Sequence, residues 1–308
     1  MKLGIVVVYF VKEENGELLD LHLSQIEKHT DVPYTIYGSV KRLLPRFREK
    51  VERQPKMKIC DIPETPLRGD DEQTFYLEHL VREAIEDGSS HIVTLHVDSF
   101  PIRPGWAEAL AGKLSESCVF ATPYYGNYTA CLFFQRDFHL KYRPAFRLSE
   151  AELSSPEYRV FCKKLKHIPH CGIGYFFKAY SEGLPWYPFA ESNKRKARYG
   201  YFCSVYDDLV FHLGGVWTYS EDETDKATSL IRARTWAWKH FWFPSFRMLW
   251  PPREALGWKR FVFPRHLMSW GWKHLGYPMF FKPILLNERK QLLEDPESYL
   301  KYIRTGRR

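Results

Sequence analysis

The chain has 308 residues, of which 44% are apolar and 27% charged, and its formal net charge is +8. This balance excludes a disordered chain. The sequence has no uncharged, predominantly apolar stretch of about 18 residues, so it does not predict a membrane-spanning helix. The six cysteines are scattered without a C-x-x-C pair, which excludes the framework of a small disulfide-rich domain and favours reduced thiols. The positive charge favours an anionic partner: a nucleotide diphosphate, a phospholipid surface or a nucleic acid.

The first 125 residues alternate between predicted strands and predicted helices. Continuous apolar runs rich in β-branched residues predict strands, and apolar residues at helical spacing predict helices. The expected strands cover residues 3–10, 34–37, 57–62, 91–97 and 118–122, and the expected helices cover 17–29, 43–53, 71–87 and a segment that starts near 105. This order implies an α/β fold with a mostly parallel, twisted sheet flanked by helices.

The carboxyl ends of two apolar strands carry the first candidate site residues. Ligands of open α/β sheets bind beyond these strand ends, so we expect Tyr9, Phe10 and Asp98 to face one crevice. A carboxylate at the end of a buried strand is well placed to hold a hard divalent cation, which in turn holds a diphosphate. An Asp before Ser and Pro is also common as the cap of a turn, and the short segment alone leaves both interpretations open.

A specific resemblance begins at this strand end. Residues 94–101 read Thr-Leu-His-Val-Asp-Ser-Phe-Pro, and Pro-Gly-Trp follows at 104–106. The segment resembles the metal-binding DxD region of GT-A-type glycosyltransferases, as in glycosyltransferase family 2 and its relatives. His96 stands where that motif has its first Asp, and Asp98 matches the second. The resemblance implies that Asp98 binds the metal and that His96 contacts the donor or binds the metal as a neutral imidazole.

A second segment resembles a later part of the same enzymes. Residues 206–215 read Tyr-Asp-Asp-Leu-Val-Phe-His-Leu-Gly-Gly. In GT-A enzymes a His in such a segment completes the metal shell, and a Gly pair lets the backbone approach the diphosphate. The resemblance implies that His212 is a metal ligand and that Gly214 and Gly215 adjoin the donor. We therefore expect His212 within roughly 3 to 5 Å of Asp98.

Further site residues are assigned from their order along the chain. Tyr9 and Phe10 are expected to pack on the donor base, and an acidic or basic residue after the third strand is expected to enter the donor site. A general base for the acceptor hydroxyl would be a carboxylate, although a solvated loop carboxylate is an equal interpretation for each candidate. Besides His96, Gly214 and Gly215, the expected donor-binding residues are Tyr9, Phe10, Asp61, Arg68 and Asp71, and the candidate bases are Glu191, Asp207 and Asp208.

Two regions are expected, the first implied by the resemblance and the second by composition. Residues 1–230 form the GT-A-like catalytic domain, with the nucleotide-sugar side in 1–125 and the acceptor side in 126–230. Residues 231–308 form a helical extension that is rich in aromatic and basic residues. Its composition suits a membrane–water interface, an ordinary aromatic core with a basic rim, or stacking on single-stranded nucleic acid.

The resemblance implies a hexosyltransferase type of enzyme in polysaccharide or glycan biosynthesis. It would move a sugar from a nucleoside-diphosphate sugar to a saccharide or lipid-linked saccharide hydroxyl, with Mn²⁺ or Mg²⁺ and with inversion. The expected location is cytoplasmic, with a peripheral contact at the inner face of the membrane. The alternative is a non-catalytic GT-A-like module that binds a membrane surface or nucleic acid, and His96 in place of Asp favours it. Nucleic acid is the less favoured partner.

Overall fold

The computed structural model describes residues 1–11, 15–123, 128–165, 171–194, 203–214 and 282–307. The chain divides into two compact units, one made of Met1–Gly214 and Asp295–Arg308, the other of Gly215–Glu294. In the second unit the structure describes the helix α13 (Lys282–Glu294). Among all described residues, no helix is long and apolar enough to cross a membrane.

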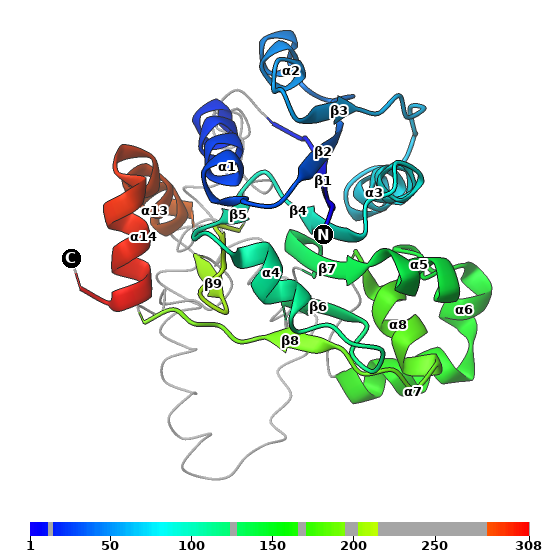
Figure 1. Ribbon diagram of the computed structural model, residues 1–308. Coiled ribbons are helices and arrows are strands. Elements are labelled where there is room, and N and C mark those ends of the chain that lie inside the picture. Colours follow the sequence, from blue (N-terminus) through cyan, green and yellow to red (C-terminus); the bar gives the residue numbers. More distant parts are fainter. Residues whose placement is uncertain (12–14, 124–127, 166–170, 195–202, 215–281, 308) are drawn as a thin grey trace, which may run out of the picture. The chain divides into compact units, whose positions relative to one another are not determined.

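The first unit is built on a seven-stranded sheet in the order β3-β2-β1-β4-β7-β6-β8 (Figure 1). Its strands are β1 (Leu3–Val8), β2 (Tyr34–Ser39), β3 (Met57–Ile59), β4 (His91–Leu95), β6 (Phe120–Pro123), β7 (Cys131–Gln135) and β8 (Tyr187–Phe189). β1 pairs in parallel with β2 and β4, β2 with β3, and β6 with β8, whereas β7 is antiparallel to β4 and β6. The expected mostly parallel sheet is confirmed.

The strand order reverses between β1 and β4. The chain moves outward from β1 through β2 to β3 and then returns to place β4 on the other side of β1. Val7 of β1 lies opposite Leu95 of β4, so both strands end at the same edge of the sheet. Ligands of open α/β sheets bind at such a switch point, beyond the carboxyl ends of the strands.

Alternating side chains of β1 supply two separate cores. Leu3, Ile5 and Val7 pack on one face, and Val6 and Val8 pack on the other. Both faces are covered because the flanking helices lie on both sides of the sheet; Figure 1 shows α1 and α3 on opposite sides of β1. The first face carries α1 (Gly16–His29), α2 (Pro45–Glu52) and α4 (Trp106–Ala111), and the second carries α3 (Asp70–Glu86), α5 (Arg136–Tyr142), α7 (Pro156–Leu165) and α8 (Ile173–Ser181).

A small antiparallel sheet adjoins the end of β4. It has the order β5-β10-β9, with β5 (Ser99–Pro101), β10 (Val210–His212) and β9 (Ser204–Tyr206). The register places His212 opposite Ser99. The chain thus leaves the large sheet directly after β4 and meets a strand that comes from far along the sequence.

The C-terminal helix α14 (Pro296–Thr305) belongs to the first unit. Lys194 N–H donates to the Ile303 carbonyl over 3.1 Å, and Arg304 pairs with Asp208 in the turn between β9 and β10. The sequence predicts this helix as part of a C-terminal extension that covers residues 231–308. The expected boundary near residue 230 and the tryptophans between 236 and 272 lie outside the described residues.

Candidate metal centre

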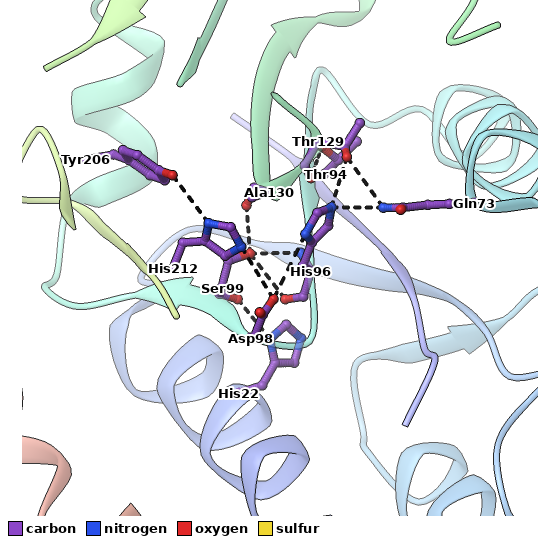
Figure 2. A network of polar contacts seen from close by, with 10 residues as sticks. All are labelled: His22, Gln73, Thr94, His96, Asp98, Ser99, Thr129, Ala130, Tyr206 and His212. Carbon is purple, nitrogen blue, oxygen red and sulfur yellow. Dashed lines mark hydrogen bonds and ion pairs between the residues drawn. The ribbon is translucent and has the colours of Figure 1, made fainter. Parts of the chain in front are cut away.

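Three side chains meet at the carboxyl end of β4: His96, Asp98 and His212 (Figure 2). Their possible ligand atoms all lie within 4.8 Å of one another. His212 Nε2 is 3.6 Å from Asp98 Oδ1, and His96 Nδ1 is 4.0 Å from the same oxygen. The distance between His212 and Asp98 falls in the range expected from the two sequence motifs.

A tight turn holds Asp98 in place, and Ser99 closes it. The Ser99 N–H donates to the His96 carbonyl over 2.9 Å, and the His96 N–H donates to Ser99 Oγ over 2.8 Å. Ser99 Oγ donates in turn to the Ala130 carbonyl at 2.6 Å, and His22 Nδ1 lies 2.9 Å from the Ser99 carbonyl. Since a carbonyl only accepts, His22 carries its proton on Nδ1. These bonds anchor the turn to the 3₁₀ turn Tyr128–Ala130, which precedes β7, and to α1.

Strand pairing brings His212 to this turn. Phe211 and His212 of β10 lie opposite Phe100 and Ser99 of β5, and the Leu213 N–H donates to the Asp98 carbonyl over 2.9 Å. The side chains of His212 and Asp98 are only 2% and 6% exposed. The backbone ladder therefore fixes the position of the second imidazole relative to the carboxylate.

Each imidazole has a hydroxyl partner on the nitrogen that points away from Asp98. His96 Nε2 lies 2.9 Å from Thr129 Oγ1, and His212 Nδ1 lies 3.3 Å from the Tyr206 hydroxyl. When these nitrogens carry the protons, the nitrogens that face Asp98 keep free lone pairs. Metal-ligating histidines usually have such an outer partner, which fixes both the tautomer and the ring orientation.

Gln73 of α3 also contacts the outer side of His96. Its Nε2 is placed 2.8 Å from His96 Nε2 and 3.4 Å from Thr129 Oγ1. As placed, the amide nitrogen donates to an unprotonated Nε2, whereas an amide rotated by 180° would accept from an Nε2–H. Gln73 therefore holds the His96 ring in either tautomer.

Burial keeps both imidazoles neutral at pH 7. It lowers the pKa of His212 and of His96 from 6.5 to about 4; for His96, the nearby Asp98 opposes this shift and His212 adds to it. Neutral imidazole is the form that binds a metal ion. The site therefore offers two neutral nitrogens and one carboxylate.

The separations are compatible with one bound divalent ion. Two ligand atoms at about 2.0–2.3 Å from a common ion lie about 2.8–3.8 Å apart for bond angles near 90–110°. The 3.6 Å between His212 and Asp98 falls in this range. The 4.0 Å between His96 and Asp98, in a set that spans up to 4.8 Å, requires the His96 side chain to rotate toward the other two. The donor set, its burial and its outer partners all fit a metal ion.

The two aromatic residues after β1 point to opposite faces of the sheet. Tyr9 is fully buried and lies edge-on to His22, with 5.8 Å between ring centroids. Phe10 is 8% exposed and lies edge-on to Tyr76 at 6.2 Å. Stacking of either ring on a nucleotide base stays a prediction, and it would require neighbouring side chains to move.

Asp61 and Arg68 lie on the exposed stretch between β3 and α3. Asp61 pairs with Lys41 at 3.1 Å, and its side chain is fully exposed. The Arg68 Nη1 donates to the carbonyls of Thr65 and Leu67 over 3.1 and 2.7 Å, which folds its guanidinium back on its own loop. The donor-binding role of both residues stays a prediction.

The N-terminal turn of α3 adjoins the centre. Asp71 belongs to this turn and pairs with Arg147 at 3.8 Å, while Gln73 contacts His96. An acidic residue in a first turn also stabilises the helix dipole, so Asp71 has a structural role in addition to the predicted one. Gly214 follows the centre with a φ of +76°, and Gly215 lies outside the described residues.

Asp207 and Asp208 form the turn between β9 and β10, both with positive φ. Arg304 pairs with Asp208 through two bonds of 2.5 and 2.8 Å and, with Arg103, holds the pKa of this carboxyl below its usual range. Asp207 Oδ1 accepts from the Ala190 N–H over 2.8 Å. Both carboxylates thus stabilise the hairpin that carries His212, and their proposed role as base stays a prediction.

Glu191 is the candidate base that is most directly linked to the centre. Its Oε1 accepts from Ser204 Oγ over 3.1 Å, and Ser204 lies opposite His212 in the hairpin. Its side chain is exposed. Glu191 is therefore accessible to solvent, and its role as a base stays a prediction.

Five residues around the centre were not expected from the sequence. Ser99 and Tyr206 lie inside the two motifs but were not assigned a role. The others had no local signal, because only the fold brings α1, α3 and residues 128–130 to the end of β4. The missed residues are His22, Gln73, Ser99, Thr129 and Tyr206.

No protein-family model and no curated protein sequence matches the chain. Similar solved structures include S. aureus TarS residues 1–349 in complex with UDP-GlcNAc, with 10% identity over 48% of this chain and 49% of that chain, at a TM-score of 0.36. They also include the mannosyltransferase PcManGT from Pyrobaculum calidifontis in complex with GDP-Man and Mn²⁺, with 14% identity over 47% of each chain, at a TM-score of 0.34.

Mouse xyloside xylosyltransferase 1 is a third similar structure, with 10% identity over 61% of this chain and 85% of that chain, at a TM-score of 0.37. The chain spans about half the length of the TarS and PcManGT structures. The mannosyltransferase and the xylosyltransferase are glycosyltransferases, the class that the two sequence motifs resemble. Because all three TM-scores are low, the function has to be inferred from the site itself.

Proposed function

We propose that the protein is a glycosyltransferase that uses a nucleoside-diphosphate sugar and a divalent ion held by His96, Asp98 and His212. The observation that carries the proposal is the meeting of His212 with the Asp98 turn at the switch point of the sheet. Two distant sequence motifs of GT-A enzymes implied this meeting, and nothing in the composition requires it.

The chain's own residues prepare the centre for a diphosphate. Ser99 and the β5–β10 ladder fix Asp98 and His212, so little reorganisation is needed on binding. Gly214 has no side chain and a φ of +76°, so the backbone beside His212 can approach a bulky anion. When bound, a divalent ion neutralises the charge that develops on the diphosphate leaving group.

The acceptor and the stereochemical outcome are finer parts of the proposal. We favour a saccharide or lipid-linked saccharide hydroxyl as acceptor, a hexosyl residue as the transferred group, and inversion at its anomeric carbon. Inversion needs a base beside the acceptor, and the exposed Glu191 is the best-placed of the three candidate carboxylates. Asp208 is less suited because two arginines already pair with it.

The rival function is a non-catalytic module of the same fold. The replacement of the first motif Asp by His96 favours it, but His96 Nδ1 still faces Asp98 with a possible ligand atom. An assay for nucleotide release from donor sugars with Mn²⁺ separates the two functions. Metal-dependent release supports the transferase, whereas binding to anionic liposomes or single-stranded nucleic acid without release supports the module.

A cytoplasmic location with peripheral membrane contact is also a proposal. It is supported by the net charge of +8 and by the aromatic and basic composition of residues 231–281, which lie outside the described part of the chain. Replacing Arg247, Arg253 and Lys259 with Gln should weaken binding to anionic liposomes, because each surface cation contributes about 1 kcal/mol. If wild-type protein does not bind anionic liposomes at low salt, the proposed membrane contact is wrong.

The donor nucleotide can be found by thermal stabilisation. A nucleotide that binds the folded state alone raises the melting temperature in proportion to its affinity. We expect one nucleoside diphosphate to stabilise the protein with Mn²⁺ and to lose this effect with a chelator or in His212→Ala. The identity of that nucleotide then selects the nucleotide sugars for the release assay.

A further inference from the structure

The candidate centre is richer in nitrogen than the motif that it resembles. Two of its three side chains are imidazoles, because His96 occupies the position of the first Asp. Its formal charge without an ion is therefore −1 where two carboxylates and one imidazole would give −2. Hard cations such as Mg²⁺ and Ca²⁺ prefer oxygen ligands and depend on ligand charge. First-row ions such as Co²⁺ bind imidazole well, and Mn²⁺, the weakest binder of that row, lies between the two groups.

The surroundings of His96 hold its ring as a ligand. Its outer nitrogen bonds Thr129 Oγ1, and the Thr129 carbonyl is itself fixed by the Thr94 hydroxyl at 2.8 Å. The His96 ring lies edge-on to the His212 ring, with 5.6 Å between centroids and 75° between planes. A ring that is fixed at its outer nitrogen and packed against a second imidazole keeps Nδ1 directed at the shared space beside Asp98 (Figure 2).

We propose that His96 determines which metal the protein uses: the centre selects first-row transition ions such as Mn²⁺ and Co²⁺ and discriminates against Mg²⁺ and Ca²⁺. This inference rests on the proposed metal centre and deepens it. The resemblance implies Mn²⁺ or Mg²⁺ as cofactor, and the inference favours Mn²⁺ over Mg²⁺. Affinity should rise from Mn²⁺ to Co²⁺ along the usual order for nitrogen ligands.

The test is a direct titration of the metal-free protein, without nucleotide or substrate. Competition with a fluorescent chelator gives the affinities for Mn²⁺, Co²⁺ and Mg²⁺ in wild type and in His96→Asp. We expect His96→Asp to shift the ratio of Co²⁺ to Mg²⁺ affinity toward Mg²⁺ by about tenfold or more, since a ligand change alters affinity at least as much as the loss of an outer partner. Spin-echo modulation from imidazole nitrogen on bound Mn²⁺ should also decrease.

Two further variants keep the test decisive. Thr129→Val removes the acceptor of the outer proton and should lower Co²⁺ affinity by about tenfold even if His96→Asp does not fold. His139→Asn is the matched control, because His139 is another histidine with a hydroxyl partner, Tyr175, but lies in α5. It should leave all three affinities unchanged.

The outcomes distinguish this inference from the proposed function. If wild type binds Mn²⁺ at the centre but His96→Asp keeps the wild-type ratio of Co²⁺ to Mg²⁺ affinity and the same nitrogen modulation, His96 is not a ligand. The inference then fails, and the metal-dependent transferase stands. If wild type binds none of the three ions, with or without nucleotide, both the inference and the metal centre are wrong.

Discussion

Asp98 is the residue on which the centre depends most. Both imidazoles face its Oδ1. The turn that carries Asp98 is held by backbone bonds, from the Ser99 N–H to the His96 carbonyl and from the Leu213 N–H to the Asp98 carbonyl. A substitution that preserves shape can remove the ligand and leave the turn intact.

Asp98→Asn should abolish metal-dependent nucleotide binding without lowering the melting temperature. The amide has the volume of the carboxylate but lacks its charge, and the loss of a negative charge at a side chain that is 6% exposed relieves a desolvation cost. Calorimetric titration with nucleotide and Mn²⁺, beside a melting curve, measures both effects. A variant that binds nucleotide and Mn²⁺ as tightly as wild type would show that this strand end is not the metal site.

His22 makes the stability of the fold depend on pH. Burial lowers its pKa from 6.5 to about 4. At a pH between these two values, His22 is protonated in the unfolded chain and neutral in the folded chain. The free energy of unfolding should therefore fall as the pH decreases from 7 to 5, with a share from His22 of about 2 kcal/mol. His22→Asn should remove that share.

Urea denaturation of wild type and His22→Asn at pH 7 and pH 5 measures the difference. The asparagine amide can still donate to the Ser99 carbonyl, so the turn keeps a donor. An unchanged pH dependence in the variant would mean that His22 is protonated in the folded state.

At the scale of elements, close packing between α8 and the segment after α5 admits no added atom at Gly174. A Cβ there would lie 1.9 Å from the Ala145 carbonyl oxygen, which is backbone and cannot rotate away. Gly174→Ala should lower the free energy of unfolding by about 3 kcal/mol or more, the upper range for overpacking. Gly112→Ala is the control, since its φ is −65° and its nearest contact would be 3.4 Å. Equal stability of the two variants would contradict this packing.

The helix α14 supports the hairpin that carries His212. Arg304 bonds both oxygens of Asp208, in a turn where two successive residues have positive φ. Arg304→Ala should cost about 1 kcal/mol of stability, a modest amount because both side chains are about a third exposed and water screens the pair. Arg304→Lys should recover part of it, and denaturant titration of the three proteins measures the order. A fully stable alanine variant would show that α14 does not hold the turn.

At the scale of the whole molecule, local patterns predicted the elements better than their pairing. The apolar runs of β1 and β4 and the spacing of α1 and α3 determine these elements, and the structure places them within a few residues of the expected bounds. The reversed direction of β7 and the departure of β5 into a second sheet depend on contacts between distant segments. A single sequence carries no local signal for such pairing.

The same limit applies to the centre. Asp98 and His212 were predicted because their neighbours form recognisable motifs. Thr129 and Gln73 support His96 only because β7 and α3 pack beside β4, and Tyr206 reaches His212 only through the register of the hairpin. The candidate ligands could be named from local sequence, whereas the residues around them became apparent only in the fold.

Release of nucleotide from a panel of nucleoside-diphosphate sugars tests the central claim most directly. With Mn²⁺, wild type should release nucleotide from at least one donor, a chelator should abolish the release, and His212→Ala should lower it by about 100-fold or more, because it removes a group that acts on charge in the transition state. Because His212 is 2% exposed and bonds the Tyr206 hydroxyl, the alanine variant should melt a few degrees below wild type, so release is measured well below both melting temperatures. No release from any donor, or release that survives both the chelator and His212→Ala, would contradict a metal-dependent glycosyltransferase.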